Sequence, residues 1–208
     1  MTTATLPALR TLPRLMAVAA LALSALVAFS QPARADEATA FVESLGQKAL
    51  SSLTAPDLGQ AEREKRVRGL LRNYFDVNTI ARFTLGPNWR NATDAEKSEY
   101  IKLFENMIVT TYAQRFSEYS GQEMKVGKST KQSERDTEVA SQIIQKDGPP
   151  VSVNWRVRNT NGTLKIIDVI VEGVSMSVTQ RSDFASVIQS GGGKVEALLE
   201  ALRKRQGK

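Results

Sequence analysis

The sequence predicts an α+β protein in which helices come first, an antiparallel sheet follows and further helices close the chain. Two changes in the spacing of apolar residues carry this prediction. Apolar residues recur every three or four positions as far as residue 121, and then at every second position between residues 122 and 171. Helical spacing returns between residues 182 and 205. Helices and strands that are segregated along the chain in this way are typical of α+β folds.

The first 35 residues have the features of a secretory signal peptide. Arg10 and Arg14 precede an uncharged apolar run, and Ala33-Arg34-Ala35 places small residues at both cleavage positions. The apolar run is shorter than the roughly 20 residues that a membrane span needs. We therefore expect residues 1–35 to be removed during export, which leaves residues 36–208 as a single periplasmic domain.

The composition limits the chemistry that this chain can perform. It contains no cysteine and no histidine. This excludes disulfides, thiolate chemistry, Ser-His-Asp catalysis and the commonest zinc or copper ligand. No nucleotide-binding or EF-hand motif occurs either. We therefore expect no catalytic residue, no metal and no cofactor.

The exported chain is expected to carry a smaller net charge than the full sequence. The 28 basic and 22 acidic residues give a formal charge of +6, and three of the arginines belong to the predicted leader. Without them the charge is about +3, which together with export argues against nucleic-acid binding.

Two helices are predicted before residue 75. Apolar spacing predicts the first over residues 38–53. Thr54 is expected to cap the second, with Pro56 and Asp57 in its first turn, where a missing amide proton costs little.

A short helix and a long one should follow. Asp76 is a good N-cap for a helix over residues 77–85, which Gly86 and Pro87 should end. Thr93 and Glu96 then form a capping box. The helix that they open carries one wide apolar face as far as residue 121 and should be the longest in the chain.

The second half of the sequence, from residue 122, predicts four strands in a meander. Two turns, over residues 146–150 and 159–162, have the composition of hairpin connections. The strands are expected around residues 124–126, 139–143, 151–157 and 164–171. A sheet of this kind, curled around the long helix, should make a cone with a hollow apolar interior.

A polar link over residues 173–180 should lead to the two closing helices. These are expected over residues 182–189 and 195–205, on either side of a flexible hinge at Gly191 to Gly193.

One long segment, residues 75–121, resembles the MlaC family of periplasmic phospholipid-binding proteins, which are also known as toluene-tolerance auxiliaries. It reads "FDVNTIARFTLGPNWRNATDAEKSEYIKLFENMIVTTYAQRFSEYSG", and its most specific part is residues 81–93. The resemblance extends to "KIIDVIVEGVSMSVTQRSDFASVI", residues 165–188, and so covers almost all of the exported chain. The stretch QRSDFAS, residues 180–186, is equally similar to a hopanoid-associated branch of the same family.

The resemblance implies both a fold and a function. The implied fold is a mixed α+β domain with a deep apolar pocket that holds phospholipid tails and leaves the headgroup outside. The implied role is to carry phospholipid through the periplasm of a Gram-negative bacterium, between an outer-membrane lipoprotein complex and an inner-membrane ABC transporter complex. A hopanoid-associated carrier of the same fold is the alternative within the family.

The predicted lining of the pocket consists of large apolar residues from the helices and the strands. Each of them is at least as well explained by an ordinary core, but as a group they should contain about half of the lining. These residues are Ile80, Phe83, Leu85, Trp89, Phe104, Met107, Ile108, Tyr112, Trp155, Val157, Ile166 and Ile170.

Several basic residues near the predicted lining are candidates to bind a lipid headgroup, a membrane or a partner protein. Arg82 and Arg90 bracket the predicted mouth and are candidates to meet a lipid phosphate, although an isolated arginine is usually just solvated. A second basic set, Arg156, Arg158 and Lys165, could face an anionic membrane or a partner, or could be the wet face of the sheet.

Two functions of other classes remain open at this point. One is a hydrolase or lyase that uses Asp168 as an acid or base, because this carboxylate stands in an otherwise apolar strand. A structural carboxylate that is satisfied by a nearby arginine or backbone amide is the simpler explanation. The other is a protein-binding module that has no small ligand.

Overall fold

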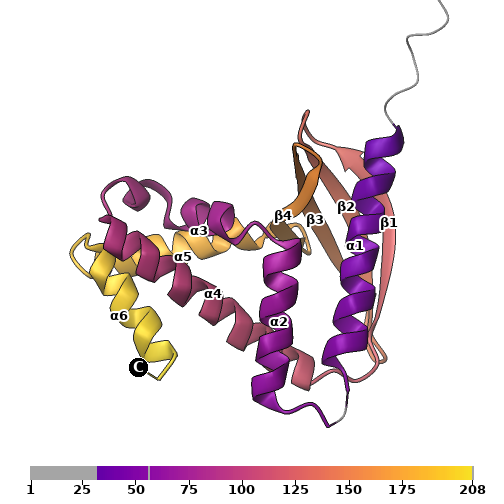
Figure 1. The fold of residues 1–208 in the computed structure, drawn as a ribbon, viewed down its shortest axis with the longest axis horizontal. Coiled ribbons are helices and arrows are strands. Elements are labelled where there is room, and N and C mark those ends of the chain that lie inside the picture. The colour runs from indigo at the N-terminus through magenta and orange to yellow at the C-terminus, as the bar shows by residue number, and fades with distance from the viewer. Residues whose placement is uncertain (1–31, 56, 208) are drawn as a thin grey trace, which may run out of the picture. The chain divides into compact units, whose positions relative to one another are not determined.

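The computed structural model describes residues 32–55 and 57–207 (Figure 1). Residues 34–208 form one compact unit. The predicted signal peptide lies almost wholly outside the described residues, so its removal stays a prediction. Pro56 lies outside them as well.

The described part of the chain is α+β, as the sequence predicts. The helices precede, and then follow, one antiparallel sheet. The elements are α1 (Pro32–Leu53), α2 (Gln60–Tyr74), α3 (Val77–Leu85), the 3-10 helix η1 (Gly86–Arg90), α4 (Asp94–Ser117), β1 (Glu123–Lys131), β2 (Asp136–Ile144), β3 (Val151–Thr160), β4 (Thr163–Val171), β5 (Val174–Ser175), α5 (Met176–Ser190) and α6 (Val195–Arg205).

The starts of α3 and α4 confirm the predicted caps. The Asp76 carboxylate accepts the N–H of Thr79 at 2.9 Å. At α4, the Thr93 hydroxyl accepts the N–H of Glu96 at 3.2 Å, and the Glu96 carboxylate accepts the N–H of Thr93 at 2.7 Å. Caps of this kind satisfy amide groups that have no partner within the first turn. Side chains a few residues apart therefore fix where both helices begin.

The predicted cap of the second helix is wrong. Thr54 does not open α2, because its hydroxyl donates instead to the carbonyl of Leu50, at 2.6 Å, within the last turn of α1. α2 begins only at Gln60, after Gly59, which makes no side-chain cap. A threonine between two helices can bond to the last turn of the first helix or cap the start of the second. The sequence alone does not show which of the two it does.

The start of α5 also differs from the prediction. The helix begins at Met176 rather than at residue 182, and Ser175 caps it by accepting the N–H of Val178 at 3.1 Å. Val174 and Val178 are 53% and 55% exposed, so the apolar residues of this stretch do not mark a buried face. The apolar residues between 174 and 181 therefore gave no sign in the sequence that the helix begins at Met176.

The sheet is antiparallel, with the strand order β1-β2-β3-β4-β5. Asn161 and Gly162 both have positive φ, 52° and 86°, at the β3–β4 turn, as an Asn-Gly hairpin requires. The fifth strand, β5, has two residues, too few to show any periodicity in the sequence. In the described strand pairing β1 and β5 do not meet, so the predicted cone is an open sheet.

A bulge in the β3–β4 pair decides which residues share a face. Val157 pairs with Ile166, and Trp155 pairs with Val169. Because β4 has an extra residue between these two pairs, all four side chains lie on one face. Figure 1 shows α1 running along the sheet, while α3, α5 and α6 gather beyond β4.

The buried apolar residues form three groups. The sheet cluster, between α1 and the sheet, is Ala38, Val42, Leu45, Tyr74, Val139, Val157 and Ile166. The helical cluster is Ala81, Leu85, Ala92, Tyr100, Leu103, Phe104, Met107, Phe184, Ile188, Val195, Leu198, Leu199 and Leu202. The bridging cluster is Leu53, Val67, Leu71, Val109 and Ala113. Phe75 packs against the sheet and bridging clusters, and Ile108 against the bridging and helical clusters.

One buried polar contact ties α3 to α4 inside the helical cluster. The hydroxyl oxygens of Thr84 and Tyr100 lie 2.7 Å apart. The Thr84 hydroxyl also donates to the carbonyl of Ile80 or Ala81, each at 3.0 Å, so Tyr100 is the donor to Thr84. Burial raises the pKa of Tyr100 above its ordinary value of 10.0.

The two hydroxyls should therefore differ in their contribution to stability. Tyr100→Phe removes a donor and leaves Thr84 bonded, and should lower the free energy of unfolding by about 1 kcal/mol. Thr84→Val leaves the buried Tyr100 hydroxyl without an acceptor and should cost more, about 1–3 kcal/mol. Urea denaturation of the two variants measures both changes.

The raised pKa also predicts a dependence on alkaline pH. Tyr100 ionises in the unfolded chain from about pH 10 but resists ionisation when folded, so its stabilising contribution is complete below that pH and is lost above it. Above pH 10 the free energy of unfolding should fall less steeply in Tyr100→Phe than in the parent. Identical slopes would contradict a buried, protonated Tyr100.

Candidate functional site

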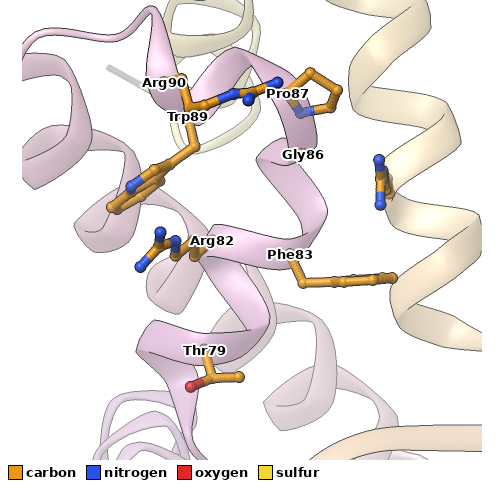
Figure 2. A pocket seen from close by; sticks show the side chains of 8 residues that line it. Thr79, Arg82, Phe83, Gly86, Pro87, Trp89 and Arg90 are labelled. Atoms are coloured by element: carbon orange, nitrogen blue, oxygen red, sulfur yellow. The ribbon is translucent and has the colours of Figure 1, made fainter.

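A pocket of about 460 Å³ lies where α3 and η1 face α5 (Figure 2). We call it the arginine pocket. It is lined by Thr79, Arg82, Phe83, Gly86, Pro87, Trp89, Arg90 and Arg181. Its size falls within the range of small-ligand sites, which is about 300–1,000 Å³.

Both walls of the pocket are attached to β4. On one side, the N–H of Asp76 donates to the carbonyl of Ile166 at 3.0 Å, immediately before α3 begins. On the other side, the Asp168 carboxylate accepts the hydroxyl of Ser175 at 2.6 Å and the N–H of Ser177 at 3.1 Å, at the start of α5. Two positions on one strand, Ile166 and Asp168, therefore hold α3 beside α5.

The chain turns sharply within the α3 wall. Gly86 ends α3 with φ +61°, a conformation that L side chains rarely adopt. η1 then brings Trp89 and Arg90 to the same concavity as Arg82. In Figure 2, Arg82 and Trp89 lie on one side of this turn, and Phe83 points the other way, toward the neighbouring helix.

Because Gly86 has no side chain, Arg181 of α5 can approach its backbone closely. A methyl group at Gly86 would lie 2.8 Å from Nε of Arg181. The Arg181 guanidinium lies over the ring of Phe83, 5.2 Å from its centroid. Gly86 is thus needed both for its backbone conformation and for this close approach.

The pocket carries positive charge that no carboxylate offsets. No aspartate or glutamate lines it, and Arg82, Arg90 and Arg181 make no ion pair with any other described residue. Other arginines of the chain do have carboxylate partners, as Arg158 has Asp136. Three guanidinium groups around one concavity provide donors for an anionic ligand.

Four of the predicted site residues meet at this pocket. Arg82, Phe83, Trp89 and Arg90 all line it, and Phe83 is 41% exposed. The sequence prediction did not include Arg181, since this residue falls between the predicted polar link, residues 173–180, and the helix predicted to begin at residue 182. Ser177, Phe184 and Ile188 mark the buried face of α5, and Arg181 follows the same spacing. Extending the helix toward residue 176 would have placed Arg181 beside that face.

The other predicted lining residues are dispersed through the fold. Ile80, Leu85, Phe104, Met107 and Ile108 belong to the helical cluster or pack against it. Trp155, Val157 and Ile166 belong in the same way to the sheet cluster. Tyr112 is 41% exposed on α4, and Ile170 is half-buried on β4 outside the three clusters. Their contact with a lipid tail stays a prediction.

The second basic set is engaged within the chain. Arg158 donates two hydrogen bonds to Asp136, both at 2.7 Å, and this contact holds the pKa of Asp136 below its ordinary value. Lys165 donates to the carbonyls of Arg72 and Asn73 at 2.9 and 2.7 Å. These side chains therefore support the sheet and its neighbours.

Asp168 has the environment of a structural carboxylate. It is 5% exposed, and besides Ser175 and Ser177 it accepts the N–H of Val169 at 2.9 Å. Arg156 lies 3.8 Å away. Asp168 does not line the arginine pocket. These bonds account for its burial without a catalytic role.

The described residues contain neither a metal-binding cluster nor a membrane-spanning helix. No group of three or more acidic side chains there could hold a metal ion. Within residues 32–55 and 57–207, none of the helices has the length and apolar character needed to cross a membrane.

A family model and curated relatives match this sequence. A family model described as MlaC protein matches residues 43–204. The intermembrane phospholipid transport system binding protein MlaC of Haemophilus influenzae is 24% identical over 130 residues, which cover 61% of each chain. The toluene tolerance protein ttg2D of Pseudomonas putida is 22% identical over 111 residues, 53% of this chain and 52% of its own. The matches therefore span about half to three fifths of these relatives.

The fold is shared with solved structures, of which one example contains a bound phospholipid. It is a phospholipid-binding protein from Ralstonia solanacearum in complex with a phospholipid, and it superposes with a TM-score of 0.71. The two chains are 24% identical, and the match covers 82% of this chain and 97% of the other. At this level of identity the likeness shows the fold alone.

The structural role of Asp168 can be tested by substitution. Asp168→Ala leaves the buried donors of Ser175 and Ser177 without an acceptor and should lower the free energy of unfolding by about 3 kcal/mol. Asp168→Asn retains one accepting oxygen and should cost about half as much. Urea denaturation measures both changes.

Asp183→Ala is the matched control, because Asp183 is an exposed aspartate on α5, the helix whose first turn Asp168 holds. Its effect should lie within about 0.5 kcal/mol of zero. An Asp168→Ala variant as stable as this control would show that Asp168 does not hold α5 to the sheet.

Proposed function

This chain belongs to the MlaC family, and on that premise we propose that it is a periplasmic carrier that binds phospholipid through its acyl chains. The observation that carries the proposal is the extent of the family match. Residues 43–204 include both walls of the arginine pocket, the long helix α4 and the whole sheet. The names of the relatives, which describe phospholipid transport and toluene tolerance, support the same reading.

The physical need for such a carrier is large. Moving a two-chain lipid through water exposes about 30 methylene groups, and at about 0.8 kcal/mol each the barrier is on the order of 25 kcal/mol. A protein interior that replaces this water contact with apolar contact removes most of the barrier. Such a carrier needs no nucleophile, metal or nucleotide, which agrees with the composition of this chain and with its family membership.

We propose that the tails lie along the boundary between the sheet cluster and the helical cluster. Phe75 and Ile108 already link the three clusters across this boundary. One helical turn beyond Ile108, Tyr112 is 41% exposed and can contact a tail without disturbing packed residues. The twelve predicted lining residues remain our candidates, and Tyr112 is a suitable one to test because it is exposed and lies outside the arginine pocket.

The headgroup would then lie outside this apolar boundary. Arg82 and Arg90 remain our candidates to bind its phosphate, since guanidinium groups form strong bonds to phosphate oxygens. Their position in a pocket without carboxylates supports this assignment.

The partners are proposed from the family alone. We propose that the chain is exported by residues 1–35 and exchanges lipid with an outer-membrane lipoprotein complex and an inner-membrane ABC transporter complex. Such exchange would help to maintain the lipid asymmetry of the outer membrane. A hopanoid-associated carrier of the same fold is the alternative, and the identity of the bound lipid separates the two.

Native mass spectrometry of the exported protein tests the proposal directly. Protein purified gently from the periplasm should carry a mass increment that fragments to a phospholipid. A hopanoid increment would identify the alternative cargo. A clean protein mass across several preparations, with no uptake of added lipid, would contradict a lipid carrier.

A substitution at Tyr112 tests the path of the tails. Tyr112→Asp places a charge where we expect hydrocarbon, so the lipid-bound fraction should fall several-fold. The side chain is substantially exposed, so the free energy of unfolding should change by no more than about 0.5 kcal/mol.

Val174→Asp is the matched control, because Val174 is an apolar residue of similar exposure that is not among the lining candidates. Its lipid-bound fraction should equal that of the parent. Equal loading of Tyr112→Asp and Val174→Asp would show that the tails do not pass Tyr112.

A further inference from the structure

The arginine pocket has features that select the charge of its ligand. Its three guanidinium groups, from Arg82, Arg90 and Arg181, bring three positive charges to a pocket of about 460 Å³. Arg82 and Arg90 are exposed, and no described carboxylate neutralises any of the three. This positive charge favours a ligand of negative charge over one that also carries an ammonium.

The aromatic rings of the pocket already have cations beside them. Arg181 lies over Phe83 at 5.2 Å, and Lys97 Nζ lies 5.8 Å from the ring centroid of Trp89. An aromatic face is the usual site for a ligand ammonium, such as that of choline or ethanolamine. The lining contains no carboxylate, and a cation of the chain already lies beside Phe83 and beside Trp89, so the pocket offers a ligand ammonium little compensation.

Arg181 lies against the turn at Gly86, with its guanidinium over the ring of Phe83. Its Nε lies so close to Gly86 that a methyl group there would stand 2.8 Å away. The start of α5, which Asp168 fixes to β4, sets the position of Arg181 along α3. The third guanidinium therefore comes from α5 and lies beside the α3 wall of the pocket.

We propose that the arginine pocket binds a phosphate group of net negative charge and disfavours a phosphate that carries an ammonium. If the phosphate belongs to the cargo, the preferred cargo is an anionic phospholipid, and this part rests on the proposed function. If it belongs to a soluble phosphate ester, the pocket is a separate anion site. Phosphodiester and phosphomonoester oxygens share the chemistry that guanidinium groups recognise.

The lipid source is tested by competition. Delipidated protein is offered phosphatidylglycerol and phosphatidylethanolamine with identical acyl chains in equal amounts, and native mass spectrometry reads the bound ratio. Phosphatidylglycerol should be enriched about tenfold, the effect of one charge-assisted hydrogen bond. Arg82→Gln combined with Arg181→Gln should bring the ratio close to one.

Two further variants separate geometry from charge. Gly86→Ala retains all three arginines but displaces Arg181, and should also reduce the enrichment. Arg135→Gln removes one positive charge from an exposed turn outside the pocket and should leave the ratio unchanged.

The soluble source is tested with glycerol 3-phosphate and no lipid. The indole N–H signal of Trp89, assigned with Trp89→Phe, is followed by NMR during a titration. A saturable shift that is lost in the double arginine variant, combined with an unchanged lipid ratio, would identify a soluble phosphate ester as the ligand.

The outcomes distinguish the two proposals. Lipid uptake with a bound ratio near one and no saturable Trp89 shift overturns the charge-selective pocket and leaves the carrier function intact. Absence of any lipid uptake by the parent overturns the carrier function, and the glycerol 3-phosphate titration then decides the pocket alone.

Discussion

The attachment of two helices to β4 is the constraint on which the arginine pocket depends. The carbonyl of Ile166 holds the chain just before α3, and the buried carboxylate of Asp168 holds the first turn of α5. An isolated carboxylate in an apolar strand would be costly to bury, and here its cost is offset by donors from Ser175, Ser177 and Val169. The same bonds that satisfy Asp168 therefore fix the helix that carries Arg181, whose guanidinium lies over Phe83.

The fold separates apolar and charged surfaces into different places. Large apolar side chains fill the three clusters, and Phe75 and Ile108 connect them. The unpaired arginines lie instead on the outer side of α3 and on η1 and α5. A phospholipid has the same division, with hydrocarbon at one end and a phosphate at the other. This correspondence is the physical basis for assigning tails to the cluster boundary and an anionic group to the pocket.

The arginine pocket shows why the pairing of a charge matters more than its presence. The sequence offered two basic sets of similar appearance. In the structure Arg158 and Lys165 bond to Asp136 and to backbone carbonyls, and so contribute to the sheet. Arg82 and Arg90 have no such partners among the described residues. Only the second kind of arginine is available to a ligand, and only coordinates distinguish the two kinds.

The sequence by itself determined the elements whose signals are local. The caps Asp76 and Thr93 act on amides three residues away, and the Asn161-Gly162 turn sets its own backbone angles, so these features could be read from neighbouring residues. The tertiary structure alone decided the start of α5, the third arginine of the pocket and the partners of Asp168. Each of these depends on contacts between segments that are not adjacent in sequence. Spacing along the chain reports which face of an element is buried, but not which distant side chain will meet it.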